Sequence, residues 1–188
     1  MKYRTIVVDP PWKYEQGLSS SPLTRGSAEK IYPVMTDEQI LAIPIPEWAD
    51  TDCQLWLWVT NSHLHRGFHC LEHWGFTYKT VLTWAKTQIG LGYWLRGKTE
   101  HCLLGTRGNP RAKFVNTKHE AAGMAHSTLL TAQRGKHSEK PQAFYDMIEE
   151  IGEPPYLDVF NRRTRLGWDA IGDEVGVKIP PGVEKRLQ

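Results

Sequence analysis

The stretch "TIVVDPPWKY", residues Thr5–Tyr14, decides how the chain begins to fold. Its apolar start, within residues 4–8, is rich in β-branched residues and predicts a short buried strand. This strand ends at Asp9, and two prolines and Trp12 follow directly. Because each proline ring fixes φ and removes a backbone donor, the sequence predicts a rigid strand end that holds an acid beside a large aromatic ring.

The chemistry of this strand end suits a heterocyclic amine. Ligands of open α/β sheets collect at the carboxyl ends of strands. An ionised Asp9 only accepts hydrogen bonds, and we expect the Pro10 carbonyl to be free to accept as well. Trp12 offers a flat face on which a base can stack. The pattern predicts attack by an oriented amino nitrogen on an electrophile, and the structural alternative is an Asp-Pro turn over a core tryptophan.

Strands and helices are expected to alternate along the rest of the chain. Apolar runs predict strands at 53–59, 77–85, 100–106, near 126–131 and at 156–160. Helical periodicity and capping residues predict helices at 37–42, 62–74 and 141–151. This alternation indicates an α/β domain with a central, mostly parallel sheet flanked by helices. The polar stretches 15–30 and 107–137 are expected to form functional loops.

Length and composition limit the class of protein. The 188 residues, of which 40% are apolar, predict a single domain, with 174–188 as a peripheral tail. No signal peptide or membrane-spanning run is expected, and three scattered cysteines predict reduced thiols in a cytoplasmic protein. The net charge of +2 does not indicate a nucleic-acid partner, although basic residues gather in 96–118 and 162–165.

Six motifs follow one another in a set order along nearly the whole chain, from Asp9 to Asp173. They are DPPW (Asp9–Trp12), YPVMT (Tyr32–Thr36), LWLWVT (Leu55–Thr60), GKTEHCLLGTRGNP (Gly97–Pro110), HSEKP (His137–Pro141) and FNR (Phe160–Arg162). In this order the chain resembles the MT-A70 family of adenine-N6 methyltransferases. The resemblance implies a Rossmann-like methyltransferase fold with permuted motif order, in which the catalytic strand precedes the cofactor strand, and S-adenosylmethionine as the cofactor.

The resemblance also assigns the catalytic and cofactor-binding positions. The catalytic positions, which would hold the target adenine, are Asp9, Pro10, Pro11 and Trp12. The cofactor-binding positions are Lys140, Phe160, Arg162, Asp173 and Glu174. Eukaryotic members carry amides where this chain has Asp173 and Glu174. The sequence starts just before DPPW, so another part of the chain is expected to cover the adenine end of the cofactor.

The local sequence favours a cofactor-binding role for Lys140 and leaves the role of Phe160 open. Lys140 precedes the clearest helix, where a basic side chain and free backbone N–H groups can meet a carboxylate. The alternative is a solvated lysine at a helix start. Phe160 at a strand end packs in the core more often than against a cofactor.

Substrate-binding residues are expected in the loops and at one strand start. The set is Tyr32, Tyr93, Trp94, Arg96, Lys98 and Glu100. Residues 93–98 mix rings and positive charge in a glycine-punctuated loop, as nucleic-acid contacts do, and the alternative is a hydrophobic plug between two strands. Glu100 matches the family's EHC motif, where the acid helps to arrange the pocket.

No metal site is expected, despite four histidines close together. His63, His65, His69 and His73 include three on one helical face. No carboxylate or cysteine completes a known ligand pattern, and methyl transfer to nitrogen needs no metal.

The combined interpretation is methylation of the N6 amine of adenine in nucleic acid, most readily DNA of a bacterial or phage type. The alternatives are an RNA adenine-N6 methyltransferase, a catalytically silent nucleic-acid-binding partner and, more remotely, methylation of a protein amide. An intact Asp9 and Trp12 argue against a silent subunit. Members of the family often act in pairs, so a homodimer or a heterodimer with a related subunit is expected.

Overall fold

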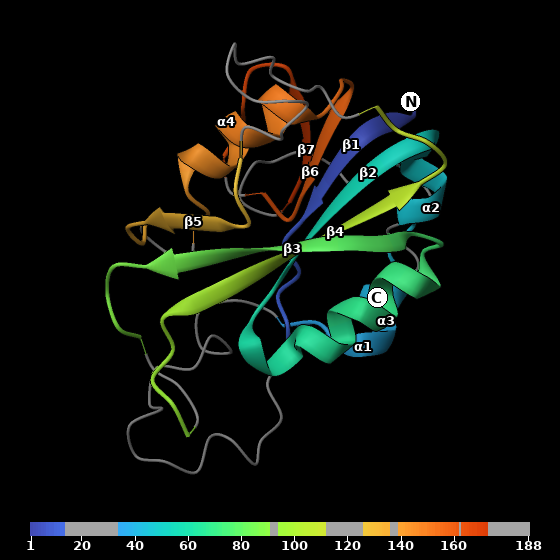
Figure 1. Cartoon of the computed structure of the whole chain (residues 1–188). Coiled ribbons are helices and arrows are strands. Elements are labelled where there is room, and N and C mark those ends of the chain that lie inside the picture. The colour runs from blue at the N-terminus through green and yellow to red at the C-terminus, as the bar shows by residue number, and fades with distance from the viewer. Residues whose placement is uncertain (14–33, 91–93, 112–125, 136–138, 162, 173–188) are drawn as a thin grey trace.

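The computed structural model describes residues 1–13, 34–90, 94–111, 126–135, 139–161 and 163–172. These residues form a seven-stranded sheet with the order β5-β3-β4-β2-β1-β6-β7 (Figure 1). The strands are β1 (Tyr3–Val8), β2 (Ala49–Val59), β3 (Thr77–Lys86), β4 (Thr99–Arg107), β5 (Leu129–Ala132), β6 (Tyr156–Val159) and β7 (Trp168–Ile171). The helices are α1 (Asp37–Leu41), α2 (Ile45–Trp48), the 3-10 turn η4 (Asn61–His63), α3 (Leu64–His73) and α4 (Gln142–Ile151).

The sheet is mixed but mostly parallel, as the sequence predicts. β1 pairs in parallel with β2 and β6, β6 with β7, and β3 with β5. Only β4 runs the other way, between β2 and β3. The carboxyl ends of β1, β2, β3 and β6 therefore lie at the same edge of the sheet as the first residues of β4. This α/β arrangement is consistent with a Rossmann-like fold.

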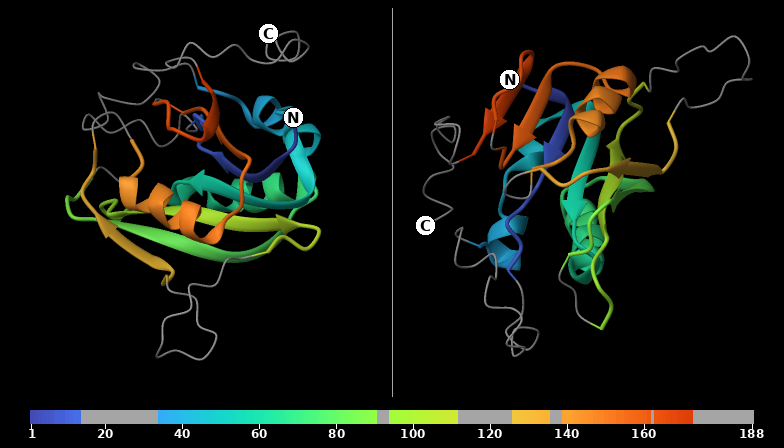
Figure 2. Two further views of the ribbon diagram at one scale, coloured as in Figure 1. Left: turned by 90° about the horizontal axis from the view of Figure 1, so that it is seen from above. Right: turned by 90° about the vertical axis from the view of Figure 1, so that its left-hand side faces the viewer.

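Helices cover both faces of the sheet (Figures 1 and 2). On one face, α4 packs Phe144, Met147 and Ile148 against Val7 and Trp58 of the sheet. On the other face, α1 and α3 pack against the opposite set of sheet side chains. The central strand β2 therefore faces apolar side chains on both sides, and this explains its continuous apolar run.

The expected elements form, with small shifts at their ends. Thr36 caps α1 in a capping box with Gln39, as its position before the acidic first turn predicts. The expected helix over 62–74 is divided into η4 and α3, and Gly75 ends it at φ 76°.

Two short elements, α2 and β7, were not predicted. β7 is an edge strand whose side chains are in part exposed, so its sequence WDAI has no continuous apolar run. Its place in the sheet depends on its parallel pairing with β6, and the pattern of its own residues does not indicate this pairing.

Several expectations fall outside the described residues. They concern the loop at 15–30, the central part of 107–137 and the tail 174–188. Within the described ranges, no helix is both long and apolar enough to cross a bilayer. Cys53, Cys70 and Cys102 are buried free thiols.

Candidate functional site

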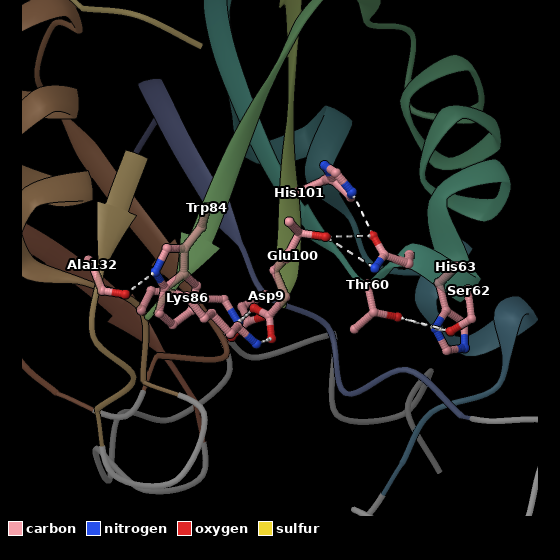
Figure 3. Close-up of polar contacts among 12 residues, drawn as sticks. Asp9, Thr60, Ser62, His63, Trp84, Lys86, Glu100, His101 and Ala132 are labelled. Atoms are coloured by element: carbon pink, nitrogen blue, oxygen red, sulfur yellow. Dashed lines mark hydrogen bonds and ion pairs between the residues drawn. The ribbon is translucent and has the colours of Figure 1, made fainter. Parts of the chain in front are cut away.

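Four charged side chains meet at the edge of the sheet where β1 ends. Asp9 follows β1, Lys86 ends β3, Glu100 is the second residue of β4, and Lys140 lies just before α4. Figure 3 shows Asp9, Lys86 and Glu100 gathered at this edge. We call these four residues the ion-pair network.

Short distances connect the network. The Lys140 Nζ lies 2.9 Å from Asp9 Oδ2 and 3.2 Å from Glu100 Oε2. The other oxygen of Glu100, Oε1, lies 2.5 Å from the Lys86 Nζ. Two ammonium groups thus alternate with two carboxylates, and their formal charges cancel.

Strand alternation explains why these side chains share one face. In β1 and β4, Val7 and Cys102 face the core beneath α4. Asp9 and Glu100 are each two residues away and therefore project to the same side. Lys140 reaches them because α4 runs along that face and its first turn lies at this edge (Figure 2).

The network is largely shielded from water, and burial and the neighbouring charges shift the pKa values of Lys140 and Glu100. The Lys140 side chain is only 7% exposed. Burial alone lowers the pKa of an ammonium, but Asp9 and Glu100 outweigh it and raise the pKa of Lys140 above its usual value. Burial likewise pushes the pKa of Glu100 upward, and Lys140 and Lys86 outweigh it and bring this pKa below its usual value. Lys140 and Glu100 are therefore charged at neutral pH.

Lys140 also packs on an aromatic ring. Its Nζ lies 5.1 Å from the centroid of Trp58, a buried residue of β2. This position differs from the solvated helix-start lysine that was the alternative in the sequence. A lysine carries three N–H donors, and its two ion pairs leave capacity for one more acceptor.

The carbonyl groups of the two prolines after Asp9 already accept hydrogen bonds within the chain. The Pro10 carbonyl accepts a hydrogen bond from the Trp12 N–H at 2.9 Å, and the Pro11 carbonyl accepts one from the Met35 N–H at 2.9 Å. The expectation that the Pro10 carbonyl is free is therefore wrong, because the chain turns back on itself at Trp12. A carbonyl oxygen has a second lone pair, so each can still accept one further donor.

Trp12 belongs to the core in this structure. Its side chain is 6% exposed, and its indole N–H donates to the Trp58 carbonyl at 3.0 Å. His63 stacks on the indole with a centroid distance of 5.6 Å and an interplanar angle of 22°. Trp12 is therefore a core tryptophan after an Asp-Pro turn, as in the alternative to a base-stacking role, and His63 covers one face of its ring. Stacking of a base on the ring remains a prediction.

His63 connects the DPPW segment to the end of β2. Its Nε2 lies 3.2 Å from the Lys13 carbonyl, and its Nδ1 lies 2.7 Å from the Thr60 hydroxyl. A carbonyl only accepts, so the ring donates from Nε2 and accepts at Nδ1 as a neutral imidazole. Burial is the main reason why the pKa of His63 is lowered. Sequence reasoning considered this residue only as a metal ligand.

The neutral state of His63 predicts a pH dependence of stability. Its pKa is lower in the folded state, so its contribution is complete above the unfolded pKa of about 6.5 and is lost as pH falls through the folded value. His63→Gln should remove this dependence, which is worth at most about 1.4 kcal/mol per pH unit. Denaturant unfolding at a series of pH values between 5 and 8 measures it. The exposed His65→Gln is the control, and parallel curves for wild type and His63→Gln would contradict the assignment.

Phe160 lies at the carboxyl end of β6, as the resemblance implies. Its backbone has φ 67°, and its N–H donates to the Ile171 carbonyl. A positive φ is uncommon for a non-glycine residue and often marks a functional turn. The partly buried ring packs against the core on the α1 and α3 side. Contact of this ring with a cofactor remains a prediction.

The described substrate-binding candidates lie near the same edge. The β3–β4 connection leaves the sheet at Lys86 and returns at Thr99, and it carries Trp94 and Leu95, which are 92% and 83% exposed. Arg96 donates to the Gly90 carbonyl at 2.9 Å, and Lys98 is exposed. Exposure of Trp94 contradicts a hydrophobic plug at this position.

Five predicted site residues lie outside the described residues. They are Tyr32, Tyr93, Arg162, Asp173 and Glu174. The histidine set gives no metal site within the described ranges, where no group of three or more potential ligands is found.

A buried acid near Asp9 was missed by sequence reasoning. Asp158 of β6 is 1% exposed and keeps Oδ2 without a partner among the described residues. Burial raises its pKa to about 7. Arg165 packs over the Tyr145 ring at 3.4 Å from the centroid. Asp158 sits in the apolar run YLDVF, and the only signal that could have identified it is an acid within an otherwise apolar strand.

Comparisons with known proteins give one consistent family. The family model described as MT-A70 matches residues 3–174. A Type II methyltransferase, M.MunI from Mycoplasma sp, is 30% identical over 191 residues, which cover 93% of this chain and 78% of that protein. A probable N(6)-adenosine-methyltransferase MT-A70-like from Oryza sativa subsp. japonica is 29% identical over 190 residues, covering 95% of this chain. The METTL3 catalytic subunit of N(6)-adenosine-methyltransferase from Homo sapiens is 27% identical over 185 residues. The chain spans about a quarter of the length of these plant and animal relatives, 24% and 28%.

Proposed function

The chain belongs to the MT-A70 family, and from this premise we propose that it is an S-adenosylmethionine-dependent methyltransferase acting on the N6 amine of adenine in nucleic acid. Family membership implies a nucleic-acid substrate, and methyltransferases of this family use S-adenosylmethionine. The observation that carries the proposal is the Asp9 carboxylate, which follows β1 and is held 2.9 Å from the buried Lys140 ammonium.

Adjacent strands bring the proposed catalytic and cofactor segments together. β1, which DPPW follows in the sequence, pairs in parallel with β6, which the FNR motif follows. The Asp9 N–H donates to the Val159 carbonyl at 3.2 Å, so the two strand ends are bonded to each other. This supports a Rossmann-like methyltransferase fold with permuted order, because the catalytic strand comes first in the chain.

Asp9 is the residue that acts on the target amine. Its carboxylate accepts a hydrogen bond from the amine, orients the nitrogen lone pair and stabilises the positive charge that develops on nitrogen. Lys140 fixes the orientation of this carboxylate through Oδ2. When bound, S-adenosylmethionine would supply a methyl group on its sulfonium sulfur for direct transfer to the amine, with the carbon–sulfur bond broken and the neutral thioether as the leaving group.

The residues near Asp9 fit the amino-acid end of this cofactor. That end carries one carboxylate and one ammonium group. Lys140, at the start of α4, would donate to the carboxylate, and the Oδ2 of Asp158, which has no partner among the described residues, would accept from the ammonium. Phe160 and Arg162 are proposed to contact the rest of the cofactor, with Asp173 and Glu174 on its terminal loop.

DNA is the substrate that we propose first. The chain covers 78% of the Type II methyltransferase M.MunI and only 28% of the N(6)-adenosine-methyltransferase catalytic subunit METTL3. An adenine within a duplex must be flipped out before it can reach Asp9. The exposed Trp94 and the basic Arg96 and Lys98 are placed beside this edge, where they can contact bases and phosphates.

Two other functions are tested by the same assay. RNA methylation uses the same chemistry, and several N(6)-adenosine-methyltransferases match the chain. A silent nucleic-acid-binding subunit has no need for a buried network that orients Asp9. A second subunit, identical or related, would add nucleic-acid contacts that a net charge of +2 does not supply.

The decisive experiment is a labelled methyl-transfer assay on DNA and RNA oligomers of matched sequence, followed by nucleoside analysis. We expect N6-methyladenine in DNA at a higher rate than in RNA. Methylated adenine only in RNA would reverse the substrate preference. Calorimetric binding of S-adenosylmethionine without methyl transfer to either polymer would indicate a silent subunit, and absence of binding would contradict the proposed activity altogether.

A further inference from the structure

Lys86 is a partly buried lysine to which the sequence patterns assign no role. It is the last residue of β3, and its side chain is 14% exposed. Its Nζ contacts Glu100 Oε1 at 2.5 Å and lies 4.9 Å from the centroid of the Trp84 ring. Its backbone N–H donates to the Lys98 carbonyl at 2.8 Å, which fixes the base of the β3–β4 connection.

A continuous series of ion pairs leads from Lys86 to Asp9. Glu100 uses one oxygen for each lysine, Oε1 for Lys86 and Oε2 for Lys140. The plane of this carboxylate is therefore fixed from both sides. Lys140 in turn divides its donors between Glu100 and Asp9. Movement of Glu100 must move the ammonium that orients Asp9.

The charge balance of the network depends on Lys86. With it, two ammonium groups neutralise two carboxylates in a place that is largely excluded from water. Without it, one ammonium faces two carboxylates, so Glu100 loses part of what keeps its pKa low. Buried ion pairs are often no better for stability than apolar residues of similar size, so a network of four charges indicates a role beyond folding.

We propose that Lys86 is a positioning residue for methyl transfer. It acts through Glu100, which holds the Lys140 ammonium against Asp9 and so keeps the Asp9 carboxylate aimed at the target amine. This inference rests on the proposed function. A purely structural lysine that joins β3 to β4 is the competing interpretation, and the two differ in what they predict for kinetics.

The first test compares Lys86→Met with Lys86→Arg. Lys86→Met should lower kcat about tenfold, since a small misplacement of a reacting group is enough for that. Its KM for the oligonucleotide should stay within about twofold of wild type, because Lys86 makes no contact with substrate in this proposal. The acid limb of the kcat profile should move to higher pH, because Glu100 loses a neighbouring positive charge. Lys86→Arg, which keeps the charge, should restore most of kcat and the position of this limb.

The second test asks whether Lys86 acts through Glu100. In a Glu100→Gln background, Lys86→Met should change kcat by no more than about twofold, since residues that act in series are not additive. Lys79→Met, at an exposed position on the same strand, is the control and should leave kcat unchanged. Thermal melting establishes that each variant is folded, and Lys86→Gln replaces Lys86→Met if the latter fails to fold.

Two outcomes separate this inference from the proposed function. Wild-type protein without methyl transfer to DNA or RNA would refute the function and the inference together. Active wild type with an unchanged kcat for Lys86→Met would refute only the inference. Losses that multiply in the double variant, or a loss that appears only as a lower melting temperature, would assign Lys86 to structure.

Discussion

Asp9→Asn should reduce methyl transfer by about a thousandfold while the protein stays folded. The amide keeps the shape of the carboxylate but removes its charge and turns one acceptor into a donor. Both the orientation of the target amine and the stabilisation of charge on nitrogen are then lost, and removal of a single group of this kind costs 10²–10³-fold in other enzymes, about 3–4 kcal/mol. Lys140 keeps its ion pair with Glu100, so we expect cofactor affinity to change little.

The measurement combines single-turnover methyl transfer with calorimetric titration of S-adenosylmethionine. Asp146→Asn, on the exposed face of α4, is the matched control and should retain wild-type rates. Substantial activity of Asp9→Asn would remove Asp9 from the reaction. Loss of cofactor affinity together with activity would assign Asp9 to binding instead.

Lys140→Met should have the largest effect on stability. The Lys140 side chain is 7% exposed and its ammonium lies between two carboxylates, so its removal leaves Asp9 without this counter-charge and Glu100 with Lys86 alone. Breaking a buried pair by removing one partner costs about 3–5 kcal/mol. Cofactor affinity should fall at least about tenfold, since a hydrogen bond to a charged group is worth about 1.5–3 kcal/mol.

The destabilisation of Lys140→Met should depend on pH with a definite sign. In the wild type, the lowered pKa of Glu100 gives a contribution that is present above its unfolded pKa and is lost as pH falls. In the variant only Lys86 still opposes burial and the neighbouring carboxylate, so the pKa of Glu100 rises relative to the wild type and protonation relieves the repulsion. The difference in unfolding free energy between wild type and variant should therefore be larger at pH 7 than at pH 5.

Urea unfolding at the two pH values measures this difference. Lys79→Met controls for the loss of a lysine in general and should show no destabilisation at either pH. An equal difference at both pH values would mean that the carboxylates do not carry the effect. Unchanged stability at pH 7 would contradict the ion pairs themselves.

Local sequence patterns predicted most of the secondary structure, because the signals are themselves local. The capping box at Thr36, the glycine after α3 and the continuous apolar run of β2 each reflect the geometry of one segment. β7 was missed, since an edge strand of four residues is stabilised by its neighbour more than by its own composition.

The sequence by itself determined the α/β class, the rigid end of β1 and, through the order of its motifs, the family. Only the tertiary structure decided which side chains contact one another. In the folded chain, Trp12 is buried in the core and stacks with His63, and the Pro10 carbonyl accepts a hydrogen bond from the Trp12 N–H. Lys140, which the sequence places only before a helix, forms an ion pair with Asp9. Lys86 and Asp158 could be recognised as candidate site residues only from their positions in the structure. The physical reason is that an ion pair depends on strand order, register and burial, which join residues far apart in the chain, whereas a proline or a cap acts on its own neighbours.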